Sequence, residues 1–372
     1  MKIIYHHPAP LGGLHSGSVV RPQMMRQALI NQGHELFEIT GERNERQKKF
    51  LELKFRIRNG EKYDYFYSES TTLPLNLRII QIFKGFKIYF PELLDQAILK
   101  YLQKENIKGG YFLRDIHWDF SNEINDKVNV IKGAYIHFFQ SIFGRMHLQF
   151  LKKNRILLFV PSLLFGNYIR KKIGWDFHVL RPGANIFCHH SRLPAEDYIG
   201  LMYVGGVAGG YDPRLFLKAV SFGSNARLVL CTRKTEWEAG TFSFQPEKVK
   251  IIHASGKELE PYYENSHIGV YTPPPFGYAK MAFSIKIAEY IGQGLPIICY
   301  RHTTVSDFVE EHQIGWTMDY DLDSIQKTIS FIFDNPDDYK LKQKNVLKLQ
   351  KEFTWESVVQ KMLNVLEKHY LK

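Results

Sequence analysis

The sequence has few cysteines and no long hydrophobic run. Its 372 residues include three cysteines, at positions 188, 231 and 299, and their spacing matches no zinc or redox motif. This argues against a disulfide framework and predicts a reducing compartment. No run reaches the ~18 apolar residues that a membrane-spanning helix needs. Residues 1–5 are too short an apolar stretch for a signal peptide.

Nucleotide and metal fingerprints are also missing. Residues 10–17 form a Gly/Pro-rich loop after a first strand, but their spacing is not that of a dinucleotide-binding GxGxxG motif. Cys188, His189 and His190 lack a second pair of metal ligands, so no metal site is expected. There is no internal repeat and no low-complexity segment. The length predicts two domains rather than one.

Positive charge is concentrated in the N-terminal half. Residues 1–185 contain 28 Lys and Arg against 16 Asp and Glu, whereas residues 186–372 contain 21 against 22. A basic half indicates an anionic partner such as a membrane surface, a nucleic acid or a phosphorylated acceptor. No nucleic-acid-binding motif is visible, so nucleic acid is the less favoured of these partners.

The hydrophobic pattern alternates between strands and helices, which predicts an α/β fold of two doubly wound domains. The first domain is expected to contain a series of strands and helices. Its expected strands are residues 2–5, 34–39, 63–67, 110–118 and 155–160, and its expected helices are 20–32, 43–58, 93–104, 140–153 and 162–172. A Pro-containing linker is expected over residues 181–200. The expected strands of the second domain are 201–204, 227–231, 250–253, 268–271 and 296–300.

Residues 283–298 are the most informative segment. They predict a short helix that carries Ser284, Lys286 and Glu289, is stopped by glycines, and leads through a proline into a buried strand. Lys286 and Glu289 share one face near the helix start. A helix start attracts anions, a lysine adds a point charge for phosphate, and a carboxylate can accept hydrogen bonds from sugar hydroxyls. The alternative is an ordinary surface ion pair.

The second half of the chain resembles the donor domain of GT-B glycosyltransferases, in particular family 4 and its bacterial polysaccharide relatives. Residues 286–298 resemble the motif K-l-x-E-Y-x-x-x-G-x-P-v-i of that family, and residues 203–206, 226–231, 249–256 and 268–273 resemble its earlier strands. The resemblance is looser in the first half. It implies two Rossmann-like domains with a cleft between them. The implied boundaries are residues 1–185 for the acceptor domain, 186–354 for the donor domain and 355–372 for a helix that packs back on the first domain.

The resemblance also implies roles for individual residues. Glu289 corresponds to the glutamate that holds the ribose, and Lys286 with the N–H groups near Ser284 would contact the diphosphate. Gly12 and Gly13 would allow close backbone approach to the sugar phosphate. The remaining expected donor-binding residues are Gly205, Gly206, Arg233, Lys234, His253 and Ser255.

Two positions depart from the family pattern. Met281 stands where the first glutamate of the E-x7-E motif is expected, and the usual R-x4-K after the first donor-domain strand is absent. We expect Arg233 or Lys234 to supply the missing positive charge.

The expected catalytic residues are Asp115, His117 and Glu69. Asp115 and His117 lie where the family places an Asp/His pair. Because they are two apart on an expected strand end, they are expected to face the same side and to accept the acceptor proton. A polar strand end paired with Arg114 is the alternative, and Glu69 could equally cap a helix or belong to a loop.

The resemblance implies a glycosyltransferase that needs no metal cofactor and uses a nucleotide-diphosphate sugar, with UDP favoured over GDP. The acceptor would be a glycan or a lipid-linked sugar in bacterial cell-surface polysaccharide synthesis. The basic N-terminal domain would touch an anionic membrane from the cytoplasmic side. A sugar-nucleotide epimerase and a non-catalytic sugar-nucleotide or anionic-surface binding protein are the alternatives. The sugar, linkage, stereochemical outcome and oligomeric state are left open.

Overall fold

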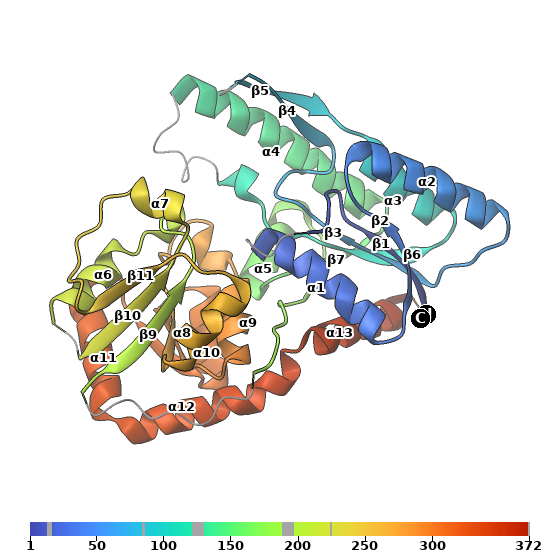
Figure 1. Cartoon of the computed structure of the whole chain (residues 1–372). Helices are drawn as coiled ribbons and strands as arrows, with labels where there is room; N and C mark the ends of the chain where they lie inside the picture. The colour runs from blue at the N-terminus through green and yellow to red at the C-terminus, as the bar shows by residue number, and fades with distance from the viewer. Residues whose placement is uncertain (13–16, 84–85, 121–129, 188–196, 224, 371–372) are drawn as a thin grey trace. The chain divides into compact units, whose positions relative to one another are not determined.

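The computed structural model describes the chain except for residues 13–16, 84–85, 121–129, 188–196, 224 and 371–372 (Figure 1). Its internal contacts divide the chain into two compact units. Unit 1 comprises Met1–Arg181 with Val358–Lys372, and unit 2 comprises Pro182–Ser357. Each unit contains a six-stranded sheet in which all neighbouring strands are parallel. The expected α/β class with two Rossmann-like domains is therefore confirmed.

Unit 1 alternates strands and helices. Its sheet has the order β2-β1-β3-β6-β7-β8, and β4 and β5 form a separate antiparallel hairpin. The strands are β1 (Lys2–His6), β2 (Glu35–Ile39), β3 (Tyr65–Glu69), β4 (Leu77–Phe83), β5 (Phe86–Pro91), β6 (Lys108–Phe112), β7 (Leu157–Val160) and β8 (Phe177–Val179). The helices are α1 (Gly17–Asn31), α2 (Arg43–Arg58), α3 (Leu94–Lys104), the 3-10 helix η1 (His117–Asp119), α4 (Val130–Lys153) and α5 (Leu163–Ile173).

Unit 2 has the sheet order β11-β10-β9-β12-β13-β14. Its strands are β9 (Ile199–Val204), β10 (Ala226–Cys231), β11 (Val249–Ile252), β12 (Ile268–Tyr271), β13 (Ile297–Tyr300) and β14 (Gly315–Met318). Its helices are η3 (Gly209–Tyr211), α6 (Arg214–Ser221), α7 (Lys234–Glu238), η4 (Gly256–Leu259), α8 (Glu260–Glu264), η5 (Ala279–Met281), α9 (Ile285–Gly292), α10 (Thr304–His312), α11 (Leu322–Asp334), α12 (Pro336–Leu349) and η6 (Gln350–Glu352).

Both faces of the unit 2 sheet are buried under helices. Met202 and Val204 of β9 belong to one hydrophobic core, which also contains side chains of α9 and α10. Leu201 and Tyr203 alternate with them and belong to a second core, with side chains of α6 and α11. A parallel strand covered on both faces is apolar along its whole length, as β9 is.

The last helix, α13 (Trp355–Tyr370), begins in unit 2 and continues into unit 1. Within unit 2, the backbone of Trp355 lies against Gly183, where a Cβ atom would come within 2.8 Å of it. Within unit 1, the Tyr370 hydroxyl donates to the carbonyl of Gly109 at 2.9 Å. The helix thus has anchoring contacts in each unit.

Each sheet has a point at which the strand order reverses. In unit 1, β1 lies between β2 and β3, and in unit 2, β9 lies between β10 and β12. The loop after β1 leads to one side of the sheet and the loop after β3 to the other, so the two loops diverge at the carboxyl ends of these strands. The loops after β9 and β12 diverge in the same way. Ligands of doubly wound folds bind at such switch points. The fold therefore indicates one ligand position in each unit.

The structure corrects some expected elements. The strand expected over residues 110–118 ends at Phe112, because the chain then turns away and the Arg114 N–H donates to the Ser70 hydroxyl at 2.9 Å. Asp115 and His117 therefore do not share a strand face, and His117 begins η1. The helix expected from residue 140 already begins at Val130, and β8, β14 and the β4–β5 hairpin were not expected.

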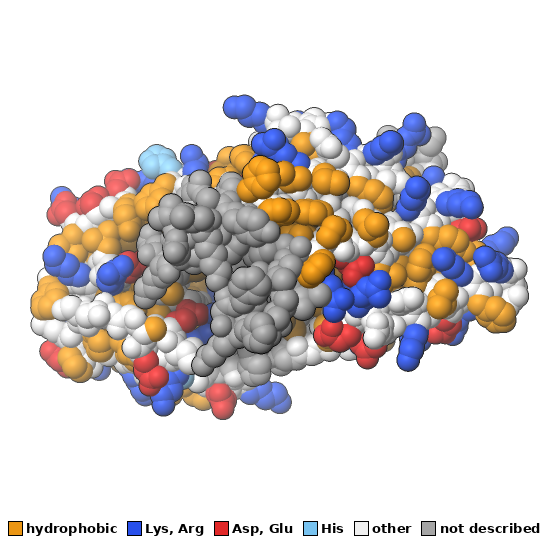
Figure 2. All heavy atoms as spheres, turned by 90° about the horizontal axis from the view of Figure 1, so that it is seen from above, with side chains coloured by type: hydrophobic (Ala, Val, Ile, Leu, Met, Phe, Trp, Pro, Cys, Tyr) orange, Lys and Arg blue, Asp and Glu red, His pale blue; other side chains and the backbone are white. Residues whose placement is uncertain are grey.

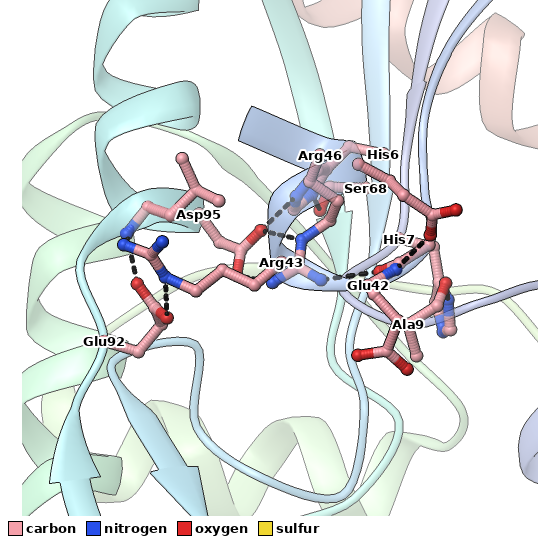
Figure 3. A network of polar contacts seen from close by, with 12 residues as sticks. His6, His7, Ala9, Glu42, Arg43, Arg46, Ser68, Glu92 and Asp95 are labelled. Atoms are coloured by element: carbon pink, nitrogen blue, oxygen red, sulfur yellow. Dashed lines mark hydrogen bonds and ion pairs between the residues drawn. The ribbon is translucent and has the colours of Figure 1, made fainter. Parts of the chain in front are cut away.

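A buried polar network fastens β1 and β3 of unit 1 to α2 and α3 (Figure 3). His6 Nδ1 lies 2.7 Å from the Ser68 hydroxyl, and His6 Nε2 lies 3.0 Å from Asp95 Oδ1. Arg46 donates to both oxygens of Asp95, at 2.8 and 2.9 Å. Ser68 and His6 have no exposed surface, so this Ser–His–Asp chain is sealed from substrate and acts as a structural brace.

Candidate functional site

The start of α9 is built as the sequence predicted. Ser284 caps the helix, and its hydroxyl accepts the backbone N–H of Lys286 at 3.2 Å. The Lys286 ammonium lies 2.9 Å from Glu289 Oε2. The side chains of Lys286 and Glu289 are 25% and 30% exposed, so both can be reached by a ligand. This places a cation, a carboxylate and a helix start together, which suits a phosphate next to a sugar hydroxyl.

Tyr290 connects this helix to the switch point. Its hydroxyl accepts the backbone N–H of Val204 on β9 and donates to the carbonyl of Val270 on β12, both at 3.0 Å. The ring fits because Gly269 has no Cβ, which would lie 2.3 Å from it. Tyr290 thus satisfies the backbone groups of the two strands where they separate and holds α9 against that opening.

We expect Tyr290→Phe to lower the thermal unfolding midpoint, because two buried backbone groups lose their partner. An unsatisfied buried group costs about 1–3 kcal/mol. Tyr271→Phe is the matched control, since the Tyr271 hydroxyl is buried without a hydrogen-bond partner among the described residues. Thermal unfolding of both variants checks this, and equal midpoints for the two would contradict the bridging role of Tyr290.

The loops after β9 and β10 bring Gly205 and Gly206 next to α7. Glu236 of α7 accepts the Val207 N–H at 3.1 Å, and its carboxylate lies 2.9 Å from the position that a Cβ of Gly206 would occupy. Glu236 also forms a short ion pair with Arg233. The charge of Arg233 is therefore already neutralised by Glu236, while its side chain is 60% exposed.

The other expected donor residues lie at the same sheet edge. Lys234 is exposed and its ammonium lies 3.8 Å from Glu238. His253 follows β11, and its Nδ1 lies 2.8 Å from the carbonyl of Thr232, which follows β10. Ser255 caps η4 in a box with Glu258. The expected donor residues of unit 2 thus follow the neighbouring strands β9, β10 and β11 or begin α9.

Glu69 lies at the carboxyl end of β3, buried inside unit 1. Its Oε1 accepts the Tyr67 hydroxyl at 2.7 Å and lies 3.3 Å from Nε of Arg21 on α1. The Arg21 guanidinium also stacks 3.6 Å from the ring centre of Phe112. Burial raises the pKa of the Glu69 carboxyl, and the charge of Arg21 opposes that rise. Glu69 is only 1% exposed, and its contacts with Tyr67 and Arg21 hold the end of β3, while its expected catalytic role stays a prediction.

Asp115 and His117 follow the end of β6, next to β3 in the sheet. Arg114 Nε donates to Asp115 Oδ2 at 2.8 Å, and Arg114 also donates to the hydroxyl of Thr72 at 2.6 Å. The other carboxylate oxygen, Oδ1, is buried and receives no hydrogen bond from any described residue. A carboxylate oxygen can accept a hydroxyl proton, although Asp115 is only 5% exposed, and His117 lies two residues on, half-buried.

The glycine loop can be placed only in part. Gly12 is exposed after β1, while Gly13 lies outside the described residues, as do Cys188, His189 and His190. Within the described part of the chain, no three His, Cys, Asp or Glu side chains are grouped so that they could hold a metal ion. No described helix is long and apolar enough to cross a membrane.

Some residues at the two switch points were missed from sequence. Tyr290 follows Glu289 directly in the motif, and its hydroxyl binding partners are 86 and 20 residues away in sequence. Arg21 carried no local signal, because its partner Glu69 belongs to another element. Glu236 has a local partner in Arg233, but its contact with the Val207 N–H spans 29 residues. One local signal was available for Tyr290. Gly269 lies in a strand of otherwise large side chains, and such a glycine indicates that another side chain packs closely against the strand.

One segment of the chain matches a known protein family. Residues 274–365, which include α9, match the family described as glucosyltransferase 3-like, C-terminal domain. No curated protein matches the chain.

Solved structures match the chain over its whole length. Sucrose-phosphate synthase from Thermosynechococcus elongatus is 13% identical, with a TM-score of 0.61 and coverage of 100% of both chains. HepE from Anabaena, in complex with UDP-glucose, is 11% identical, with a TM-score of 0.60 and coverage of 99% and 100%. WaaG, a glycosyltransferase involved in lipopolysaccharide biosynthesis, is 11% identical, with a TM-score of 0.58 and coverage of 98% and 99%.

At these identities the solved structures establish the fold, and the matched domain adds the class of enzyme. Neither comparison singles out family 4, which stays a prediction. The chain has the GT-B fold, its residues 274–365 are similar to the glucosyltransferase 3-like C-terminal domain, and the expected class of GT-B glycosyltransferase is confirmed.

Proposed function

We propose that this glycosyltransferase moves a sugar from a UDP-sugar to a glycan or lipid-linked acceptor in cell-surface polysaccharide synthesis. The observation that carries the proposal is the start of α9, where Lys286 and Glu289 lie 2.9 Å apart beside capped helix N–H groups at the switch point. Support for UDP comes from HepE, whose structures hold UDP and UDP-glucose. WaaG supports a cell-surface product.

The residues that bind the donor can be assigned from the charge that develops in the reaction. Breaking the bond between sugar and diphosphate leaves negative charge on the leaving phosphate, which a helix start and a lysine stabilise. Lys286 would turn from Glu289 to the phosphate, and Glu289 would then accept the ribose hydroxyls. Lys286 is the cation that we assign to the diphosphate, because it lies beside the capped N–H groups at the start of α9, whereas Arg233 and Lys234 lie at the start of α7.

The acceptor end needs a group that takes a hydroxyl proton. Asp115 is favoured over Glu69, because Asp115 has a carboxylate oxygen without a hydrogen-bond donor among the described residues, whereas Glu69 is held by Tyr67 and Arg21. His117 is the second candidate. In a retaining reaction the donor phosphate can accept this proton instead, and Asp115 would then orient the acceptor.

The finer assignments belong to the same proposal. We place the enzyme close to family 4 and to bacterial polysaccharide enzymes, with activity that does not depend on a bound metal. Its place of action would be the cytoplasmic face of the cell membrane, reached by the basic unit 1. Unit 1 would bind the acceptor and unit 2 the donor.

A nucleotide panel tests the proposal. Thermal unfolding would be followed with UDP, GDP, UDP-glucose, UDP-galactose, UDP-N-acetylglucosamine and GDP-mannose, with and without EDTA. We expect stabilisation by UDP and one UDP-sugar, unaffected by EDTA. Stabilisation by GDP compounds alone would overturn the choice of base.

An activity measurement separates the proposal from its alternatives. Transfer of labelled sugar to a lipid-linked saccharide extract supports the transferase. Conversion of a free UDP-sugar to its epimer, with no transfer, would favour an epimerase. Nucleotide binding with neither reaction would favour a binding protein.

A further inference from the structure

Helix α4 has an inner face that packs on unit 1. Gly144 lies so close to Trp118 of η1 that a Cβ atom would come within 2.0 Å of the indole nitrogen. The Ser141 hydroxyl donates to the Trp118 carbonyl at 3.0 Å. His147 and Leu148 are completely buried. This face holds η1, the helix that begins with His117, against α4.

The outer face of α4 is apolar over two turns. Phe138, Ile142 and Met146 are 61%, 40% and 53% exposed. At 100° per residue, their spacing of four places them within an arc of roughly 80° on one side of the helix. In Figure 2, which looks down on the upper side of Figure 1, hydrophobic side chains gather on the surface there, with Lys and Arg side chains around them. Large exposed side chains in line are unusual unless a partner covers them.

The same face becomes cationic toward the end of α4. A hollow of about 430 Å³ is lined by Gln149, Lys152, Lys153, Lys172 and Ile173. Lys172 is ion-paired with Asp119. Lys152 donates to the Ile173 carbonyl at 2.7 Å, which orients the ammonium without neutralising it. The hollow therefore keeps a positive charge.

Helix α4 and the two hairpin strands contain no acidic residue. The 24 residues of α4 contain no Asp or Glu. The hairpin strands β4 and β5 contain none either, although they carry Arg78 and Lys87. Where the hairpin ends, Phe90 and Leu93 are 44% and 64% exposed. Glu92, between Phe90 and Leu93, is buried and paired with Arg43, and Asp119 is paired with Lys172. The exposed apolar side chains therefore lie next to positive charge, which complements a bilayer with an apolar interior and anionic headgroups.

We propose that the outer face of α4 docks the protein on an anionic lipid bilayer. Phe138, Ile142 and Met146 enter the boundary between headgroups and acyl chains, and Lys152 and Lys153 bind lipid phosphate. An interfacial helix of this kind lies in the plane of the membrane, and its affinity rises with buried apolar area and with anionic lipid. This assigns membrane contact to one helix face rather than to the whole basic half.

The inference rests on the proposed function where it concerns the acceptor. Because the inner face of α4 holds η1, docking of the outer face brings His117 to within about one helix diameter, roughly 10 Å, of the membrane surface. A sugar carried on a lipid would be presented at that depth. A lipid-linked acceptor is therefore the substrate class that this surface favours over a free glycan.

Vesicle sedimentation tests the docking surface. The full chain would be mixed with vesicles of phosphatidylcholine alone or with 30% phosphatidylglycerol. We expect binding to the anionic vesicles and none to phosphatidylcholine. The variant Phe138→Ser/Ile142→Ser/Met146→Ser should reduce the partition coefficient at least tenfold. Lys152→Gln/Lys153→Gln should reduce it about 30-fold, the effect of two lysines near an anionic surface.

The matched control is Leu51→Ser/Phe55→Ser. These residues lie on α2 and are 58% and 66% exposed, so they test whether any exposed apolar pair has the same effect. Their variant should bind vesicles as the native chain does. Inorganic phosphate at 10 mM should not displace the protein, because a free anion lacks the acyl boundary. Release of the protein from the vesicles by phosphate would indicate a site for soluble phosphate and would contradict docking on a bilayer.

Other outcomes would also overturn the inference. Equal vesicle binding by the native chain and the triple variant would show that the outer face of α4 is not the docking surface. A native dimer that the triple variant turns into a monomer, measured by light scattering, would show that a second copy covers this face. Circular dichroism shows whether each variant is folded. Vesicle binding does not require the sugar donor, so this test can be interpreted even if UDP does not bind. The nucleotide test can likewise be interpreted if vesicle binding fails.

Discussion

Lys286→Ala is expected to lower kcat/KM for sugar transfer by about 100-fold or more. The loss of one donor to a developing negative charge costs about 10²–10³ in rate in other enzymes. Lys286 lies in the first turn of α9, and among the described residues its ammonium is paired with the partly exposed Glu289. It is therefore available to the leaving diphosphate. Its removal also leaves the Glu289 carboxylate uncompensated next to an anionic ligand, which weakens binding further.

Steady-state kinetics and nucleotide binding of the variant check this prediction. Lys257→Ala is the control, because Lys257 is an exposed lysine of η4 at the same edge of the unit 2 sheet. If both variants transfer sugar at the native rate, Lys286 does not contact the diphosphate. A loss in both would indicate a general effect of positive charge at this edge. A loss in Lys286→Ala alone assigns the effect to the start of α9.

The donor half of the site was predictable because its signals are local. The Ser284 cap, the spacing of Lys286 and Glu289, and the stop at Gly292 all fall within one short segment. Helix capping and i,i+3 pairing act between neighbours in sequence, so they can be read without knowing the fold. The strand after it begins at Ile297, one residue from its expected start.

The first half of the site was less predictable, because it depends on contacts between distant segments. The strand toward Asp115 was expected to continue to residue 118, but it ends where β3 supplies Ser70 to the Arg114 N–H. Glu69 was expected as a catalyst. Its partner Arg21 is 48 positions earlier, and no local pattern announces such a pair. Non-local ion pairs decide whether a carboxylate faces a ligand or the core, and single-sequence reasoning does not see them.

The two switch points consequently differ in character. At β9 and β12, the polar groups of α9 are partly exposed and the strand ends are closed from behind by Tyr290. At β1 and β3, the polar groups of His6, Ser68 and Glu69 are turned inward and satisfied inside unit 1. The first arrangement suits tight binding of a charged ligand. The second arrangement makes the carboxyl ends of β1 and β3 rigid. Asp115 and His117 lie beside them, in the segment that follows β6.

The rigidity of these strand ends depends on Asp95. Asp95→Asn should lower the free energy of unfolding of unit 1 by about 3 kcal/mol or more, because breaking a buried ion pair leaves an uncompensated charge. Arg46 is 6% exposed and would lose its charged partner. Asparagine keeps one oxygen that can accept from His6 and Arg46, but its NH2 group replaces the second oxygen, to which Arg46 also donates. Asparagine keeps the shape of aspartate, so the change removes charge without creating a cavity.

The pH dependence of stability provides a second test of the ion pair between Asp95 and Arg46. Burial would raise the pKa of Asp95, but hydrogen bonds from His6 and Arg46 outweigh it and lower the pKa below its usual 3.8. The carboxylate therefore contributes stability above its unfolded pKa, and this contribution is lost as the pH falls through the lowered pKa of the folded state. The difference between native chain and variant should persist from pH 7 to pH 4 and shrink only below that.

Hydrogen exchange read by mass spectrometry can locate the effect within the chain. Peptides from β1 and α3 should exchange faster in Asp95→Asn, while peptides from β9 to β14 keep their rates, because the network lies wholly within unit 1. Glu52→Gln is the control. Glu52 pairs with Lys49 and Arg56 on the surface of α2, where solvent screens the pairs, so little change is expected. Equal exchange in β1 and α3 for the two variants would show that the buried network does not hold unit 1 together.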